Sequence, residues 1–197
     1  IIPQSLLLDG QQRMTSLYQV TLRGKVIETI TSKNKKVKRW FYLDIRKSLD
    51  PSKDREEAIM GVPEDKIVRT NFGREIASDL STPEKEYALL MFPVSQVFDW
   101  DRWQDGFDKY WRGDQNESIR EEFRAFKRHV LDNFKRYLVP VITLDSSTSK
   151  EAVCVVFEKV NTGGKPLDAF ELVTAMYAAS GHELRKDWYG EDGIKGR

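Results

Sequence analysis

The chain has 197 residues and a formal net charge of +1, and 32% of its residues are charged. A chain of this length can bury a core in one or two domains, and its near-neutral charge excludes a global attraction to nucleic acid, so any DNA affinity must come from local patches. The single cysteine, Cys154, excludes an internal disulfide framework. With only two histidines, His129 and His182, the sequence predicts neither a Cys/His zinc site nor a His-based nuclease centre.

The sequence has no membrane-targeting feature. No apolar run approaches the roughly 20 residues that span a bilayer, and the N-terminus has no signal-peptide pattern. We therefore expect a cytoplasmic protein with no membrane partner. The chain begins at Ile1, inside a predicted strand, which indicates a fragment or a processed piece of a longer protein.

Short strands and helices alternate in the first half of the chain. The run Ser5–Leu8 predicts a strand that ends at Asp9, and apolar residues at helical spacing predict a helix from Gly10 to a stop at Gly24. The remaining predictions are a hairpin of strands Lys25–Thr31 and Lys38–Ile45, short helical pieces at Arg55–Met60 and Arg74–Asp79, and an extended Phe92–Val94.

Helices dominate from Trp100 onward. The apolar face from Trp103 to Trp111 predicts one helix, and the apolar periodicity from Ile119 to Tyr137 predicts a long amphipathic helix that ends before Pro140. The rest is predicted as a strand at Leu138–Leu144, a turn at Ser146–Ser149, helices at Glu151–Val160 and Leu172–Ala179, and a frayed tail from Gly181. For Glu151–Val160 the β-branched residues favour a strand, but the segment runs into a glycine pair typical of a helix ending, and we favour the helix.

The first candidate site is the stretch Asp9–Arg13, at the predicted strand-to-helix turn. A purely structural explanation is a capping box, in which Asp9 caps the helix and Gln12 reaches back to it. Gly10 argues against that explanation, because glycine is a poor helix former and suits a backbone that a ligand approaches closely.

The functional explanation is a phosphate pocket. Amide groups at a helix start point outward with positive potential, and Arg13 can lean back over them. Asp9 would repel a phosphate unless it faces a Mg²⁺ ion or a nucleotide hydroxyl. Both options stay open, and Asp9 is the candidate metal ligand. Gln11 or Gln12 could orient an attacking water, and Arg13 could stabilise the developing charge.

The second candidate is the loop that contains Asn161, Thr162, Gly163 and Gly164, followed by Lys165. A helix–turn–helix corner explains most of these residues. Two adjacent glycines beside Asn, Thr and Lys would also expose amide donors to an anion. Both explanations stay open, and nothing in the periodicity shows that this loop meets the first motif.

Two further features favour structural explanations. Five cations within seven residues, from Lys33 to Arg39, could hold DNA phosphates, but a solvated strand edge explains them as simply. The aromatic and acidic segment Phe98–Trp103 could stack bases, but such residues more often form a core.

The two motifs together resemble a known family. Leu7–Leu17, with Asp9-Gly10-Gln11-Gln12-Arg13 at its centre, and Val156–Leu167, with its Asn161-Thr162-Gly163-Gly164 loop, are similar to the two signatures of the GmrSD-type restriction-system N-terminal domain. Tyr42-Leu43-Asp44, after the basic hairpin, is similar to the mid-domain strand of that family. The resemblance covers residues 3 to 180.

The resemblance implies a fold and an activity. The expected fold is α+β and ParB/sulfiredoxin-like, with a small mixed sheet and a helical C-terminal half. We expect residues 1–95 to form a nucleotide-binding part and residues 96–197 a helical part of the same module. The expected activity is NTP hydrolysis within a bacterial defence system against modified foreign DNA, with NTP and Mg²⁺ as cofactors. The expected partners are an HNH-type nuclease domain or subunit and DNA, and an oligomer is left open.

The resemblance also assigns roles to residues. Asp9, Gln11, Gln12 and Arg13 are implied in hydrolysis, and Gly10, Thr15 and the loop from Asn161 to Gly164 in nucleotide binding. A departure is the missing Ile-Pro-x-x-Gln-Arg-x-Tyr-x-Trp motif that generally opens the family, for which Ile2-Pro3-Gln4 is too short. Three alternatives remain: a non-hydrolysing nucleotide switch or DNA-binding module, a nuclease built on the ParB-like fold, and a structural scaffold.

Overall fold

The computed structural model describes residues 7, 10–145, 147–149, 152–153, 155–156, 173–174, 177, 182 and 184–189. Contacts divide the chain into two compact units, Ile1–Leu138 and Val139–Arg197. The predicted functional division at residues 95 and 96 stays a prediction. Within the described residues, no helix is long and apolar enough to cross a membrane.

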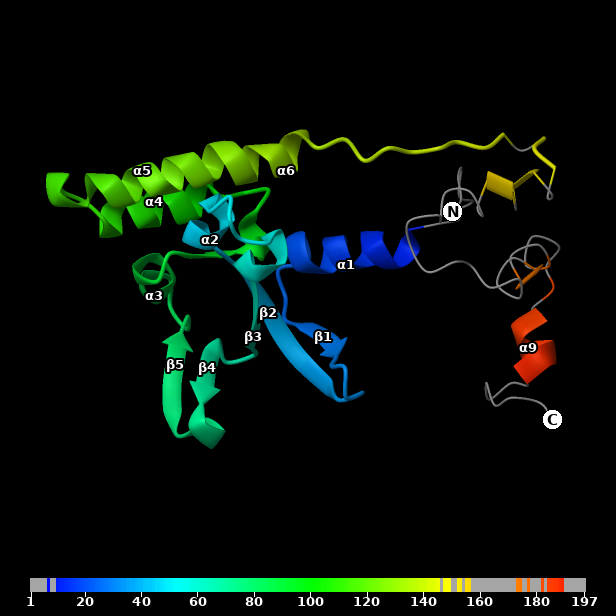
Figure 1. Ribbon diagram of the computed structural model, residues 1–197, viewed down its shortest axis with the longest axis horizontal. Helices are drawn as coiled ribbons and strands as arrows, with labels where there is room; N and C mark the ends of the chain where they lie inside the picture. The colour runs from blue at the N-terminus through cyan, green and yellow to red at the C-terminus, as the bar shows by residue number, and fades with distance from the viewer. Residues whose placement is uncertain are drawn as a thin grey trace. The chain divides into compact units, whose positions relative to one another are not determined.

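The first unit combines helices with short antiparallel strands, which confirms the predicted α+β class (Figure 1). Its helices are α1 (Gln11–Thr21), α2 (Ile45–Leu49), α3 (Pro83–Ala88), α4 (Asp101–Tyr110), α5 (Glu117–Phe126) and α6 (Asp132–Arg136), with the π-helical η5 (Lys127–Leu131) between the last two. Single 3-10 turns lie at η1 (Arg55–Ala58), η2 (Asn71–Gly73), η3 (Val94–Gln96) and η4 (Asp114–Asn116). The strands are β1 (Ile27–Ile30), β2 (Lys36–Asp44), β3 (Ile59–Pro63), β4 (Ile67–Thr70), β5 (Glu75–Asp79) and β6 (Met91–Pro93).

Strand β2 organises the main sheet. It pairs antiparallel with β1, β3 and β6, and β4 and β5 form a separate hairpin. Because β3 occupies one edge of β2 from Arg39 to Leu43, β1 and β6 share the other edge. Successive side chains in a strand point to opposite faces, so alternate residues of β2 pack into two different apolar clusters. Leu43 packs in the larger apolar cluster and Tyr42 in a smaller one.

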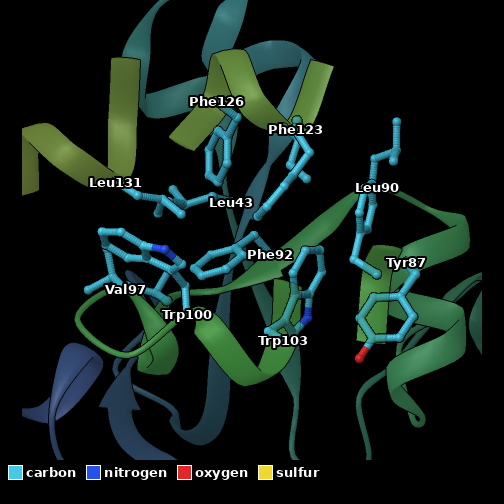
Figure 2. Close-up of a cluster of buried hydrophobic side chains, with 13 residues drawn as sticks. Leu43, Tyr87, Leu90, Phe92, Val97, Trp100, Trp103, Phe123, Phe126 and Leu131 are labelled. Carbon is cyan, nitrogen blue, oxygen red and sulfur yellow. The ribbon is translucent and has the colours of Figure 1, made fainter. Parts of the chain in front are cut away.

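The larger cluster is aromatic and joins the sheet to the helices (Figure 2). Phe92 of β6 lies against Trp103 of α4 and Phe126 of α5, with ring centroids 5.0 and 5.6 Å apart. Trp103 stacks on Phe107, one turn further along α4, at 5.2 Å. The predicted core reading of the segment Phe98–Trp103 is confirmed for Trp100 and Trp103, which are both buried.

Several predicted elements are confirmed. The hairpin forms as β1 and β2, the extended stretch forms as β6, and the first long helix forms as α1. The amphipathic helix runs as α5, η5 and α6 and ends at Arg136, before Pro140. In the second unit, residues 152–153, 155–156, 173–174 and 177 are helical, which agrees with the helices expected at Glu151–Val160 and Leu172–Ala179.

Other predicted elements are wrong. The expected helix at Arg74–Asp79 is strand β5, because three successive left-handed residues, Asn71, Phe72 and Gly73, turn the chain back onto β4. Of Arg55–Met60 only η1 is helical, since Ile59 and Met60 pair with β2. The expected strand Leu138–Leu144 does not form, because the described residues provide it no partner strand. The tail contains a helix, α9 (Leu184–Tyr189), where fraying was expected.

Candidate functional site

The start of α1 carries the first motif. Its N-cap is Gly10, with φ 81° and ψ 6°, and the helix begins at Gln11. The prediction that Gly10 lies within the first turn is therefore wrong, and the structural alternative in which Asp9 is the N-cap does not hold. A positive φ is a conformation that residues with a Cβ rarely adopt, so the backbone itself favours a glycine at this position.

Arg13 lies back over the cap, as its position in the helix predicts. A Cβ placed on Gly10 would lie 3.7 Å from Nη2 and 3.9 Å from Nε of Arg13. The carbonyl of Gly10 accepts the N–H of Met14 at 2.8 Å, the first bond of the helix. The guanidinium is thus held beside the end of α1 from which the amide groups point outward.

The two glutamines of the motif have different surroundings. The side-chain amide of Gln11 donates to the carbonyl of Leu7 at 2.7 Å, which ties the helix start to the chain before it. The side chain of Gln12 makes no hydrogen bond within the described residues, and it is exposed. Gln12 is therefore the freer of the two to contact a ligand.

The first turn of α1 is open and contains no acidic residue. Residues 11 to 18 are all exposed, Thr15 among them. The positive potential of the helix start is therefore not offset by a carboxylate within the first turn. An arginine, outward-pointing amides and an exposed glutamine side chain are groups that bind an oxyanion.

The other predicted site residues lie outside the described part of the chain. These are Asp9 and the loop residues Asn161, Thr162, Gly163 and Gly164, so the shared pocket and the metal role of Asp9 stay predictions. Among the described residues, no group of three or more His, Cys, Asp or Glu side chains is placed to hold a metal ion. His129 is exposed in η5.

The sequence analysis missed a buried polar cluster centred on Glu86 of α3. Its Oε1 accepts the hydroxyl of Tyr42 at 2.7 Å and the ammonium of Lys66 at 3.2 Å, and its Oε2 accepts the indole N–H of Trp103 at 3.0 Å. Burial, followed by the charge and hydrogen bond of Glu86, raises the pKa of Tyr42 well above its usual range. The cluster joins β2, α3 and α4, and no sequence signal marks Glu86 as buried.

The sequence analysis also missed part of the basic region. A hollow beside β1 is lined by Arg23 and Lys25, together with Gln19, Val26, Glu28 and Lys38. Arg23 and Lys25 would have been found by extending the count of basic residues toward the N-terminus from Lys33.

Comparisons with known proteins agree with the motifs. The family model described as "GmrSD restriction endonuclease, N-terminal domain" matches residues 2–178. The chain is 25% identical over 189 residues to the uncharacterized protein MJ0686 of Methanocaldococcus jannaschii, an alignment that covers 94% of this chain. The chain spans only 30% of the length of that relative. No solved structure gives a significant match.

The family match covers most of the chain, including the Asp9–Arg13 motif and the loop from Asn161 to Gly164. The chain therefore belongs to the family of GmrSD restriction endonuclease N-terminal domains.

Proposed function

We propose that the chain is the nucleotide-binding and NTP-hydrolysing module of a modification-dependent restriction system, and that it regulates a separate HNH-type nuclease domain or subunit. The observation that carries this proposal is the start of α1, where a left-handed Gly10 cap lies beneath the guanidinium of Arg13. Membership of a restriction-endonuclease family supports a defence role.

The residues at this helix start fit a nucleoside triphosphate. The open first turn and Arg13 suit a phosphate group, and Gly10 keeps the approach to the backbone clear of a side chain. Bound Mg²⁺ would supply positive charge against the phosphates, and Asp9 is the residue of the motif that would hold it.

The two glutamines then have separate tasks in this proposal. Gln11, whose amide donates to the carbonyl of Leu7, fixes the start of the helix in this proposal. Gln12, whose amide makes no bond within the described residues, orients the attacking water. Arg13 stabilises charge on the transferred phosphoryl group, and the loop from Asn161 to Gly164 borders the same pocket.

The proposal is tested by turnover of radiolabelled ATP and GTP with Mg²⁺. We expect Arg13→Ala and Gln12→Ala each to lower the hydrolysis rate by about 10²-fold or more, the usual cost of removing a group that stabilises the transition state. The matched control is Arg112→Ala, an exposed arginine whose side chain makes no bond within the described residues. Hydrolysis by Arg13→Ala at the parental rate would contradict the proposal.

The same assay separates the alternatives. Tight nucleotide binding without product release would favour a nucleotide switch. Metal-dependent DNA cleavage by this chain alone, lost in Asp9→Ala, would favour a nuclease. The absence of thermal stabilisation by any nucleotide would favour a structural scaffold.

A further inference from the structure

The β1–β2 hairpin forms a ribbon that extends away from α4 and α5 (Figure 1). The register pairs Ile30 with Lys36 at the tip, and the turn is closed by a bond from the N–H of Thr31 to the carbonyl of Lys35 at 3.0 Å. Asn34 takes the left-handed conformation of the turn, with φ 58°. Backbone hydrogen bonds therefore fix the conformation of the turn that carries the lysines.

Charge is concentrated on this ribbon and on the segment that leads into it. Residues 23 to 39 contain seven cations and one carboxylate, Glu28, in a chain whose formal net charge is +1. The cations are Arg23, Lys25, Lys33, Lys35, Lys36, Lys38 and Arg39. The rest of the chain is therefore net acidic, and its near-neutral total conceals a strongly basic region.

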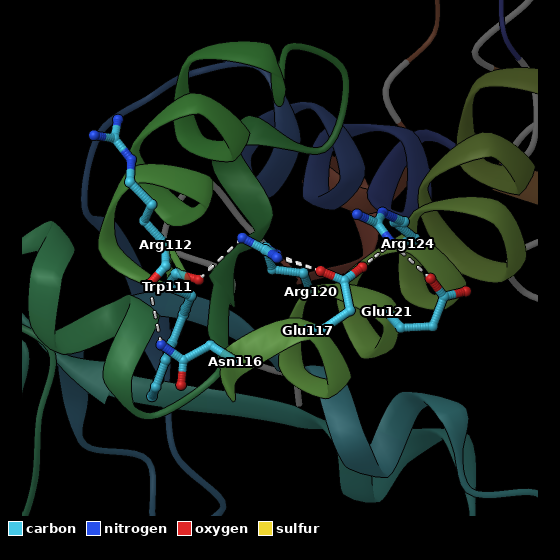
Figure 3. Close-up of polar contacts among 7 residues, drawn as sticks. All are labelled: Trp111, Arg112, Asn116, Glu117, Arg120, Glu121 and Arg124. Atoms are coloured by element: carbon cyan, nitrogen blue, oxygen red, sulfur yellow. Dashed lines mark hydrogen bonds and ion pairs between the residues drawn. The ribbon is translucent and has the colours of Figure 1, made fainter. Parts of the chain in front are cut away.

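Most of these cations have no carboxylate partner. Lys38 pairs with Glu64 at 3.1 Å, and the other six form no ion pair within the described residues. Helix α5 shows the opposite arrangement (Figure 3). There Arg120 pairs with Glu117, and Arg124 pairs with both Glu117 and Glu121. The arginines of α5 are thus paired within the protein, whereas six of the seven cations of residues 23 to 39 have no ion pair among the described residues.

Edge protection explains this charge poorly. Strand β1 is the outer strand of the sheet, and its four residues include no cation. The lysines lie instead on the turn, on β2 and in the segment before β1. Two cations of that segment, Arg23 and Lys25, line one hollow together with Lys38 of β2.

A bilayer surface also fits poorly. Residues 31 to 36 contain no apolar side chain, and the single exposed apolar residue beside them, Ile30, is much less than the apolar face of a membrane-binding segment. A two-stranded ribbon does fit the major groove of B-DNA, and lysines and arginines contact the flanking phosphates of such a complex.

We propose that the β1–β2 ribbon, with Arg23 and Lys25, binds the phosphate backbone of double-stranded DNA. The proposal rests on the proposed role in a restriction system, because such a system acts on DNA. Binding at the ribbon is largely independent of base sequence, since its cations carry charge and little hydrogen-bonding information. It brings DNA to the module without using the nucleotide motif on α1.

The test is fluorescence anisotropy of the 197-residue chain with a short labelled duplex, without nucleotide, from about 50 to about 200 mM salt. Each phosphate contact contributes about 0.9 to the slope of log affinity against log salt. We expect the triple variant Lys33→Gln, Lys35→Gln, Lys36→Gln to lower that slope by about 2 to 3 and to weaken binding at least about tenfold at the lowest salt.

The matched control is the triple variant Arg74→Gln, Lys109→Gln, Arg112→Gln. It removes the same charge from exposed positions whose side chains form no ion pair within the described residues. We expect it to bind the duplex within about twofold of the parent, with an unchanged salt slope. Circular dichroism melting checks that both variants fold.

Three results would overturn the proposal: no binding of the parent to the duplex, equal loss in the two triple variants, or tighter binding to RNA or to phosphatidylserine vesicles than to the duplex. The ribbon variant should keep the NTP turnover of the parent. Loss of DNA binding with turnover intact supports the ribbon site. If the parent bound the duplex but did not hydrolyse NTP, the nucleotide proposal would be rejected and the proposed DNA site on the ribbon would still stand.

Discussion

Glu86 is a carboxylate surrounded by aromatic side chains, and it is only 3% exposed. Burying a charge without partners is unfavourable, so its three donors, Tyr42, Lys66 and Trp103, are what make the position tolerable. The ammonium of Lys66 also lies 5.4 Å from the centre of the Trp40 ring and 5.7 Å from that of Tyr42. This cluster closes the face of the sheet opposite Leu43.

Removing this carboxylate should destabilise the protein strongly. We expect Glu86→Ala to lower the free energy of unfolding by about 3 to 5 kcal/mol, because it leaves a buried hydroxyl, an indole N–H and a partly buried ammonium without their acceptor. Glu86→Gln keeps the shape but loses the charge, and should cost about 1.5 to 3 kcal/mol. Urea unfolding measures both.

The control for this cluster is Glu56→Gln, an exposed carboxylate in η1. It should change the unfolding free energy by less than about 0.5 kcal/mol, as is usual for surface substitutions. Equal effects of Glu86→Gln and Glu56→Gln would show that the cluster does not stabilise the fold.

Gly10 shows how one residue limits inference from sequence. The glycine indicated an unusual backbone conformation at this position, and the structure agrees. The immediate reason for a glycine is the left-handed conformation of the N-cap of α1. A close approach by a ligand is compatible with that geometry and is not required by it. The sequence could identify the position, while only the dihedral angles supply the reason.

At the scale of elements, helix α3 packs against helix α4 at Gly106. A Cβ on Gly106 of α4 would lie 2.8 Å from the Cζ of Tyr87 and still closer to its hydroxyl oxygen. Tyr87 has little room to move, because its ring packs edge-on against Trp103 at a centroid distance of 4.9 Å. The contact between the two helices therefore depends on the missing side chain.

Gly106→Ala should destabilise the protein despite the better helix propensity of alanine. Propensity favours alanine by about 1 kcal/mol, whereas overpacking a core typically costs about 1 to 3 kcal/mol. We expect a net loss of about 1 kcal/mol or more, measured as a lower urea midpoint.

A second substitution locates the cause of that loss. The hydroxyl of Tyr87 makes no hydrogen bond within the described residues, so Tyr87→Phe alone should cost little. Combined with Gly106→Ala it removes the nearest atom and should recover part of the loss. If the double variant were no more stable than Gly106→Ala, crowding against Tyr87 would not be the cause.

The elements also differ in how well sequence predicts them. The helical periodicity of α5 and the aromatic run of β2 are local signals, and both elements form where expected. Strand β5 was predicted as a helix, because its pairing depends on a left-handed turn and on β4. Leu138–Leu144 carries strand-forming residues but forms no strand, since a strand needs a partner that local sequence cannot supply.

At the scale of the whole molecule, surface carboxylates set the response to acid. Lys85, with Ser81, lowers the pKa of Asp79 to about 2. Hydrogen bonds from Arg120 and Arg124 lower the pKa of Glu117, and Arg69 lowers that of Asp65. In each case the folded state binds the proton less readily than the unfolded chain does.

Stability should therefore fall at acid pH. These carboxylates stabilise the fold fully above their unfolded pKa values, near 4, and for Asp79 that contribution is lost as pH falls toward 2. We expect the urea midpoint to drop between about pH 5 and about pH 2, and Asp79→Asn to be less stable than the parent at pH 6 but to converge with it at the acid end. A constant difference between the two proteins across this range would contradict the prediction.

The sequence alone determined the hairpin, the principal helices and the family, because periodicity, turn residues and the two motifs are local patterns that need no tertiary contact to be recognised. It could not determine which charges are neutralised or which carboxylate is buried. Glu86 meets Tyr42 across 44 residues, and Arg46 meets Glu122 across 76 residues, so these partners are chosen only when the chain folds. The same physics leaves most of the ribbon cations without an ion pair, because within the described residues only Lys38 among them meets a carboxylate.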